Sequence, residues 1–177
     1  GWSKQPPVQL QLRHVDRFEL RHENEWPLAR TRWEKFYLHP ADKALSREPS
    51  HESAKLTYDP TGDGLSFLTV PLQEETEITG PVAAKLFISS ATTDADLFLV
   101  LRVFAPDGTE VTFQGSNDPH TPIGIGWLRA SQRKLDPALS LPYRPYHTHD
   151  EKRPLVPGVP VELDVEIWPT CMVFRKG

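Results

Sequence analysis

Proline and glycine interrupt this sequence so often that strands are favoured over helices. The 177 residues include 18 prolines and ten glycines, which divide the chain into short pieces. Both residue types punctuate local structure, and a long helix rarely survives such spacing. Many short segments separated by turn signals are typical of an antiparallel sandwich or jelly roll. We therefore predict an all-β jelly-roll β-sandwich with little helix.

The segments between these breakers alternate polar and apolar residues, as half-buried strands do. The clearest is VELDVEIW, residues 161–168, in which every second residue is apolar until Trp168. DLFLVLRVF, residues 96–104, is apolar on both faces, so we expect cover on both sides in the centre of the sandwich. Short helical turns are expected at 41–45 and 130–135. Further strands are predicted over residues 8–13, 31–38, 64–70 and 82–90.

Charge and composition limit the partners of such a domain. Lys and Arg total 20 against 24 Asp and Glu, giving a net charge of −4 with no basic stripe. Neither nucleic acid nor a membrane is therefore an expected partner, and the apolar runs are too short to span a bilayer. The single cysteine, Cys171, excludes an internal disulfide and favours a cytoplasmic location.

Several side chains capable of chemistry lie in the segment from Gly126 to Gly158. Ser131, His147 and His149 supply residue types of a hydrolytic triad, and Asp150 could orient a histidine. The serine lacks the G-x-S-x-G turn that lifts a nucleophile into reach. We therefore favour a structural or interdomain loop and keep a catalytic set as the alternative.

Two short motifs have the residue types of metal ligands. His147 and His149 form an H-x-H pair, but a third ligand is not evident. Asp94 and Asp96 could hold calcium, but the glycine and the distal glutamate of an EF-hand loop are missing. We predict no metal site and interpret the aspartates as part of a turn that leads into a strand.

Tryptophan supports a second function class, a carbohydrate-binding jelly-roll module. Exposed coplanar indoles form platforms for sugars, although packing in cores and interfaces is their commoner use. Four tryptophans are candidates for such a platform: Trp26, Trp33, Trp127 and Trp168.

One block of the sequence, from Pro71 to Val111, combines several distinctive motifs. The motifs follow an acidic run. They are Ile78-Thr79-Gly80-Pro81, Ser89-Ser90, Asp94-x-Asp96 and Pro106-Asp107-Gly108. Together they resemble the C-terminal domain of the X-Pro dipeptidyl-peptidase and cocaine-esterase-like (CocE/NonD) serine hydrolases. ENEWPLARTRWEKFYLHP, GWLRASQRKLDP and PLVPGVPVELDVEIWPT extend the resemblance to nearly the whole chain.

The resemblance implies a jelly-roll, galactose-binding-like domain that follows an α/β-hydrolase domain with a Ser-Asp-His triad. The triad is expected upstream of this chain, so no catalytic residue and no cofactor are implied here. Residues 1–40 are expected to form a crossover segment and first strands after the missing hydrolase domain. Residues 41–177 are expected to form the β-sandwich, truncated so that the last family strand is lacking.

We therefore predict a non-catalytic domain that packs on the α/β-hydrolase domain and shapes access to its active site. The substrate of the parent enzyme would be a small ester or amide, and a homo-oligomer is a further option. Aromatic and arginine side chains are enriched at interfaces, and the loop from Gly126 to Gly158 is the candidate interdomain contact. Its candidate residues are Trp127, Arg129, Arg133, Tyr143, Arg144, Tyr146, His147 and His149.

Overall fold

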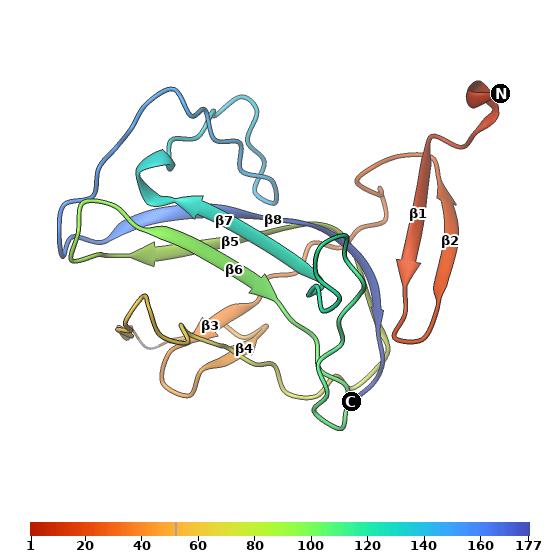
Figure 1. Ribbon diagram of the computed structural model, residues 1–177, viewed down its shortest axis with the longest axis horizontal. Coiled ribbons are helices and arrows are strands. Elements are labelled where there is room, and N and C mark those ends of the chain that lie inside the picture. Colours follow the sequence, from red (N-terminus) through yellow and green to blue (C-terminus); the bar gives the residue numbers. More distant parts are fainter. Residues whose placement is uncertain (52) are drawn as a thin grey trace.

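The computed structural model describes residues 1–51 and 53–177, and nearly all of its regular structure is strand (Figure 1). Glu52, in the predicted sandwich domain, lies outside the described residues. In the described part the helices are two 3₁₀ turns, η1 (Trp2–Lys4) and η2 (Ala130–Gln132). The strands are β1 (Val8–Arg13), β2 (Phe18–Glu23), β3 (Tyr37–His39), β4 (Ala44–Ser46), β5 (Thr76–Ile88), β6 (Asp96–Leu101), β7 (Gly124–Arg129) and β8 (Val161–Phe174). The all-β prediction is confirmed, and neither of the two short turns has the length that a membrane crossing requires.

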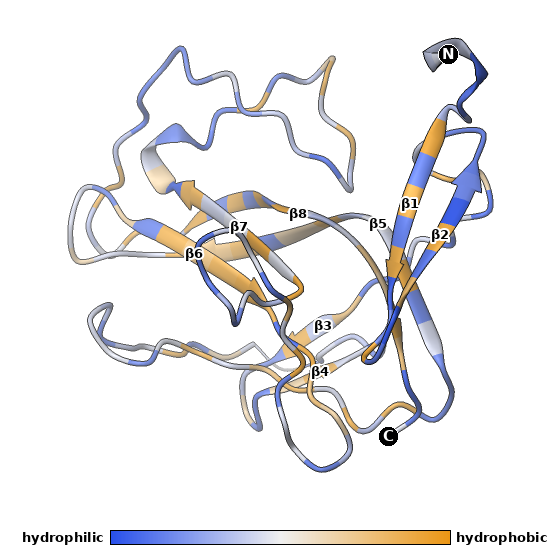
Figure 2. Ribbon diagram, turned by 45° about the vertical axis from the view of Figure 1, so that its right-hand side comes forward, coloured by the Kyte–Doolittle hydropathy of each residue, from blue (hydrophilic) through white to orange (hydrophobic). Residues whose placement is uncertain are grey.

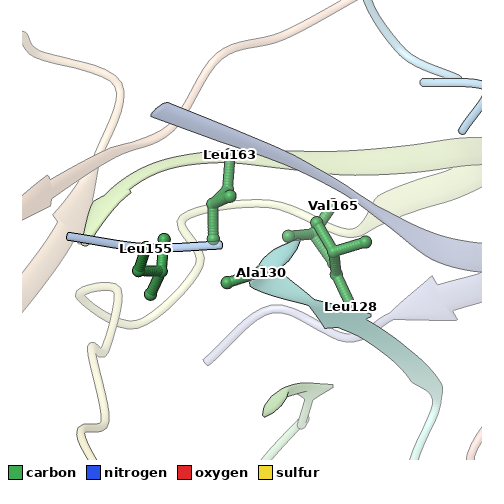
Figure 3. Close-up of a cluster of buried hydrophobic side chains, with 5 residues drawn as sticks. All are labelled: Leu128, Ala130, Leu155, Leu163 and Val165. Atoms are coloured by element: carbon green, nitrogen blue, oxygen red, sulfur yellow. The ribbon is translucent and has the colours of Figure 1, made fainter. Parts of the chain in front are cut away.

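Two strand pairs pack face to face and enclose the core. β5 and β8 pair antiparallel along nearly their whole length within a sheet of order β2-β1-β8-β5. β6 and β7 form a separate antiparallel pair that lies across β5 and β8 (Figure 1). Side chains between the pairs form the cluster drawn in Figure 3: Leu128, Ala130, Leu155, Leu163 and Val165. A second cluster continues the core with Val111, Ile123, Met172 and Phe174.

β8 shows why the alternating pattern was informative. Leu163, Val165 and Ile167 are buried, as predicted, and the strand continues beyond the predicted range as far as Phe174. Its ladder with β5 shifts register between Gly80 and Val82, around Pro81, which has no N–H to donate. The expectation that this chain lacks the last strand of the family domain stays a prediction.

Gly126 allows β7 to cross β8 at very short range. A Cβ atom at this position would lie 2.1 Å from the carbonyl oxygen of Glu166, so only glycine fits. The crossing also brings Trp127 beside Trp168, with ring centroids 5.1 Å apart. The segment that we predicted as a loop from Gly126 onward therefore begins inside a strand, and this boundary is corrected.

The β1–β2 hairpin stands beside the sandwich rather than within it (Figure 2). In the described part, one backbone pairing, between Arg13 and Met172, joins β1 to β8. Side chains strengthen this attachment, since Arg21 of β2 donates to both carboxylate oxygens of Glu77 at 2.6 and 2.8 Å. The hairpin is therefore held by a few specific contacts instead of a continuous ladder.

Two predicted strands are mostly irregular. Of residues 31–38, only the last two belong to a strand, β3, and Trp33 stacks on Tyr143 instead of pairing. Of residues 64–70, only Leu68 makes a β-bridge. Aromatic and β-branched residues favoured strands in both places. Trp33 packs on a distant ring instead, whereas residues 64–70 are mostly exposed, with Leu68 at 60% and Val70 at 76%.

The two predicted helical turns have different outcomes. Residues 41–45 form the turn and second strand of the β3–β4 hairpin, so the helical prediction is wrong there. Lys43 in this turn has a φ of 58°, which a helix does not accommodate. Residues 130–135 begin with η2, so a single turn is confirmed.

The prediction that residues 96–104 are covered on both faces is wrong. β6 is shorter than predicted and, among the described residues, pairs only with β7. Leu97 and Leu99 pack against the core cluster, but Phe98 is 77% exposed and Val100 is 52% exposed. One apolar face of this strand is therefore open to solvent.

Candidate docking surface

The outer side of the β6–β7 pair carries an apolar patch, here called the β6–β7 face. It consists of Phe98, Val100, Ile125 and Trp127. Phe98 lies opposite Trp127 in the ladder and Val100 lies opposite Ile125. Directly opposed side chains in an antiparallel pair are in contact range, so the four form one surface. Trp127 is 51% exposed, and the neighbouring Trp168 is 57% exposed.

An ion pair bounds one end of the β6–β7 face. Arg129 lies opposite Asp96, and its Nε and Nη2 donate to the two carboxylate oxygens at 2.7 and 2.9 Å. These hydrogen bonds lower the pKa of Asp96 and raise that of Arg129. An apolar centre with a charged rim is the usual composition of a protein–protein interface.

The eight predicted contact residues do not gather in one place. Trp127 and Arg129 lie on the β6–β7 face, as strand residues rather than loop residues. Arg133 donates to the carbonyl oxygens of Ala130, at 3.1 Å, and of Arg153. Arg133 therefore ties the following loop to the sandwich, and its donors face inward.

The aromatic members of the loop also divide. Tyr143 stacks on Trp33 with ring centroids 3.8 Å apart and planes inclined by 8°, so it packs the loop against the segment that carries Trp33. Tyr146 is 49% exposed, and Arg144, two residues earlier, is also exposed. Of this group, Arg144 and Tyr146 thus remain accessible to a partner.

The two histidines have unequal environments. The Nε2 atom of His147 is buried and has no hydrogen-bond partner among the described residues. Burial lowers the pKa of His147, and His149, whose ring centroid lies 6.0 Å away, acts in the same direction. His147 therefore packs as a neutral ring, whereas His149 is exposed.

The residue types of a hydrolytic triad are not assembled around Ser131. Its Oγ donates to a carboxylate oxygen of Asp94 at 2.6 Å, and its backbone N–H donates to the other at 2.9 Å. Ser131 is only 3% exposed. Asp150 accepts hydrogen bonds from Lys134 at 3.0 and 3.1 Å rather than orienting an imidazole. Asp94 holds the entry to β6, as the turn interpretation predicted.

The four tryptophans do not form a flat platform. Trp33 is stacked on Tyr143, and the rings of Trp127 and Trp168 are inclined to each other by 55°. Trp26 and Trp168 line a groove beside β1. The four indoles are therefore not coplanar, and the carbohydrate-binding interpretation loses the platform on which it depended.

Sequence reasoning missed the exposed aliphatic and aromatic residues of β6. The sequence of residues 96–104 is apolar on both faces, which could have indicated an exposed apolar face. We assigned both faces to the core instead. It also missed Arg13, which lines the same groove as Trp26. Arg13 sits in the alternating segment VQLQLR, and nothing local distinguishes it from a solvated strand residue.

Two solved structures place the fold among known enzymes. A CocE/NonD family hydrolase from Staphylococcus aureus superposes with a TM-score of 0.92 and 25% identity, over 99% of this chain and 33% of that one. An aminopeptidase from a marine sediment Thaumarchaeota archaeon shares the fold with a TM-score of 0.65 and 16% identity, over 97% of this chain and 31% of that one. The chain thus spans about a third of each solved protein.

Sequence comparisons agree with the structural likeness. Proteins of Mycobacterium bovis and Mycobacterium tuberculosis, both bearing the name "putative serine esterase", are 34% identical over 118 residues. The aligned part is 64% of this chain and 17% of each relative. The family model described as the X-Pro dipeptidyl-peptidase C-terminal non-catalytic domain matches residues 1–177. The protein therefore belongs to the family of X-Pro dipeptidyl-peptidase C-terminal non-catalytic domains.

Proposed function

We propose that this chain is the accessory domain of a serine hydrolase and packs on an α/β-hydrolase domain through the β6–β7 face. The observation that carries the proposal is Phe98, a phenylalanine 77% exposed in the middle of a strand and directly opposite Trp127. Monomeric proteins rarely leave such aromatic patches open, and patches with polar rims mark interaction sites. The solved S. aureus hydrolase has about two-thirds of its chain outside the matched region, enough for a further domain.

Burial of these side chains would supply a useful part of the docking energy. Complete burial of one large apolar side chain contributes about 1.5–3 kcal/mol. Phe98 and Trp127 form the centre of the face, and the ion pair of Asp96 and Arg129 lies at its rim. Arg144 and Tyr146 are the loop residues that remain available to extend the contact.

The docked domain would restrict entry to the active site of its neighbour. Clefts between domains are common positions for small-molecule sites. The reaction would be hydrolysis of a small ester or amide, in which a serine of the neighbouring domain attacks the carbonyl and forms an acyl-enzyme. This chain would supply no catalytic group. The single cysteine supports a cytoplasmic location for the enzyme, and a homo-oligomer is compatible with the same surface chemistry.

Alanine substitutions in the full-length enzyme test the docking surface. Phe98→Ala and Trp127→Ala are expected to lower the Tm, to weaken the coupling of the two domains in calorimetry and to raise KM. Truncation of a central aromatic residue in an interface costs about 2 kcal/mol or more. Arg129→Ala, at the rim, is expected to have a smaller effect.

Phe87→Ala is the matched control, because Phe87 is 70% exposed but lies on β5, away from the β6–β7 face. The proposal is wrong if the variants at Phe98 and Trp127 keep the Tm, the coupling and the KM of this control.

A further inference from the structure

A groove beside β1 combines an apolar lining with two accessible indoles. Trp26 is 39% exposed and Trp168 is 57% exposed. The lining includes Leu10, Pro122, Ile125 and Pro169. Trp168 also contacts Trp127, so the groove adjoins the β6–β7 face and shares Ile125 with it. A ligand in this groove would meet mostly hydrocarbon and aromatic surface.

The cation of the groove, Arg13, is fixed in place by the sandwich. Its Nη2 donates to the carbonyl oxygen of Ile123 at 2.9 Å and to Thr170 Oγ1 at 2.5 Å. Its Nε donates to the carbonyl oxygen of Cys171 at 3.4 Å, and its guanidinium carbon lies 4.7 Å from the centroid of the Phe113 ring. The guanidinium is therefore oriented before any ligand arrives.

This charge is not neutralised within the chain. Among the described residues no carboxylate forms an ion pair with Arg13, whereas Arg21, Arg102 and Arg129 each have at least one. Among the described residues Nη1 makes no hydrogen bond, and it is not completely buried. Burial of the group lowers the pKa of Arg13, as expected for a cation without an anionic partner.

We propose that the groove binds a monocarboxylic acid with an aromatic or branched aliphatic body. The carboxylate accepts hydrogen bonds from Nη1 of Arg13, which supplies the missing counter-charge. The apolar body occupies the groove against Trp26 and Trp168. A neutral sugar would leave the guanidinium without a counter-ion, and a small inorganic anion would leave the indoles uncovered.

Ester hydrolysis releases a carboxylic acid, so the site would bind a product of the parent enzyme that carries such an apolar body. That link rests on the proposed function, whereas binding of the acid by this chain does not. The two proposals also have separate tests, because docking is measured in the full-length enzyme and acid binding in the 177-residue chain.

A titration with three probes tests the site. Phenylacetate, acetate and 2-phenylethanol are added in turn to the ¹⁵N-labelled chain, and amide shifts around the groove are followed by NMR. Phenylacetate is expected to bind at least tenfold more tightly than either other probe, because acetate lacks the apolar body and 2-phenylethanol lacks the charge. Equal affinity for acetate, equal affinity for 2-phenylethanol, or no binding of phenylacetate would each overturn the proposal.

Two variants assign the binding to the groove. Trp168→Ala removes an exposed indole and is expected to weaken phenylacetate binding at least fivefold, and Arg13→Lys is expected to do the same by removing the planar donor group. Trp2→Ala is the control, because Trp2 is 91% exposed and does not line the groove. Arg13→Lys also loosens the hairpin, so Trp168→Ala decides: unchanged affinity in this variant refutes the site.

Discussion

Ser131 shows how a potentially reactive residue can have a purely structural role. Its hydroxyl is buried and donates to Asp94, which also accepts the backbone N–H of Ala95 at 3.0 Å. Burial opposes ionisation of Asp94, but the hydrogen bonds from Ser131 prevail and lower its pKa. One carboxylate therefore fastens η2 to the start of β6. The pair lies 37 residues apart in sequence, so no local pattern could predict it.

Ser131→Ala is expected to lower the free energy of unfolding by about 1–3 kcal/mol, because a hydrogen bond to a charged group is lost in a buried place. Urea denaturation measures the change. Ser116→Ala, at an exposed serine, is the control and should stay within about 0.5 kcal/mol of the wild type. Hydrolysis of a nitrophenyl ester by the wild-type chain, lost in Ser131→Ala, would contradict the structural role.

His147 is expected to make stability depend on pH near neutrality. Because burial lowers its pKa from the usual 6.5, the unfolded chain takes up a proton first as the pH falls. The stabilising contribution is complete above about pH 6.5 and declines below it. His147→Gln should therefore reduce the loss of Tm between about pH 7.5 and 5.5, before most carboxylates titrate. His120→Gln, at an exposed histidine, is the control; an equal effect of both variants would show that His147 is not responsible.

Strands in which polar and apolar residues alternate regularly can be predicted from the sequence. Strand β7, in which a glycine allows the backbone to approach β8, cannot. The segments at 8–13, 82–90 and 161–168 correspond to β1, part of β5 and most of β8, because each keeps period two locally. The part of β7 from Gly126 onward is predicted as loop, and the structure corrects this to strand as far as Arg129. The reason for the glycine at 126 lies in β8, far along the chain, where the carbonyl of Glu166 leaves no room for a side chain.

Gly126→Ala is expected to destabilise the fold by about 1–3 kcal/mol, since β7 and β8 must separate to admit a methyl group. Gly62→Ala is a suitable control, because a Cβ there would lie no closer than 3.4 Å to a neighbouring heavy atom. Thermal denaturation of both variants compares the two positions. If they have the same Tm, the close crossing of β7 and β8 does not constrain the sequence.

At the scale of the whole molecule, the sequence predicts which faces are apolar but not what covers them. The family resemblance and the sandwich architecture were both correct, and the family was carried by motifs between Pro71 and Val111. The role of the candidate contact residues in docking stays a prediction; within the chain, Arg133 donates to the carbonyl oxygen of Ala130 and Tyr143 stacks on Trp33. A period-two pattern is the same whether the cover comes from this chain or from another polypeptide, and β6 illustrates that ambiguity.

The open β6–β7 face should make the isolated chain self-associate at high concentration. Phe98→Lys is expected to lower the apparent mass in sedimentation velocity, because it places a charge at the centre of the patch. Phe87→Lys introduces the same charge on another exposed aromatic position and should have less effect. Equal effects of the two lysines would indicate that net charge, and not the β6–β7 face, controls association.

The attachment of the β1–β2 hairpin has a consequence for variation within the family. The hairpin is joined to the sandwich by one ladder pair and the side chain of Arg13, by the contact of Arg21 with Glu77, by the ion pair of Asp16 with Arg175 and by the edge contact of Phe18 with Phe113. Hairpin residues outside these contacts can change in composition without disturbing the ladder of β5 and β8. The hairpin is therefore a module that evolution can remodel, or that an engineer can graft between homologues, while the rest of the domain keeps its shape.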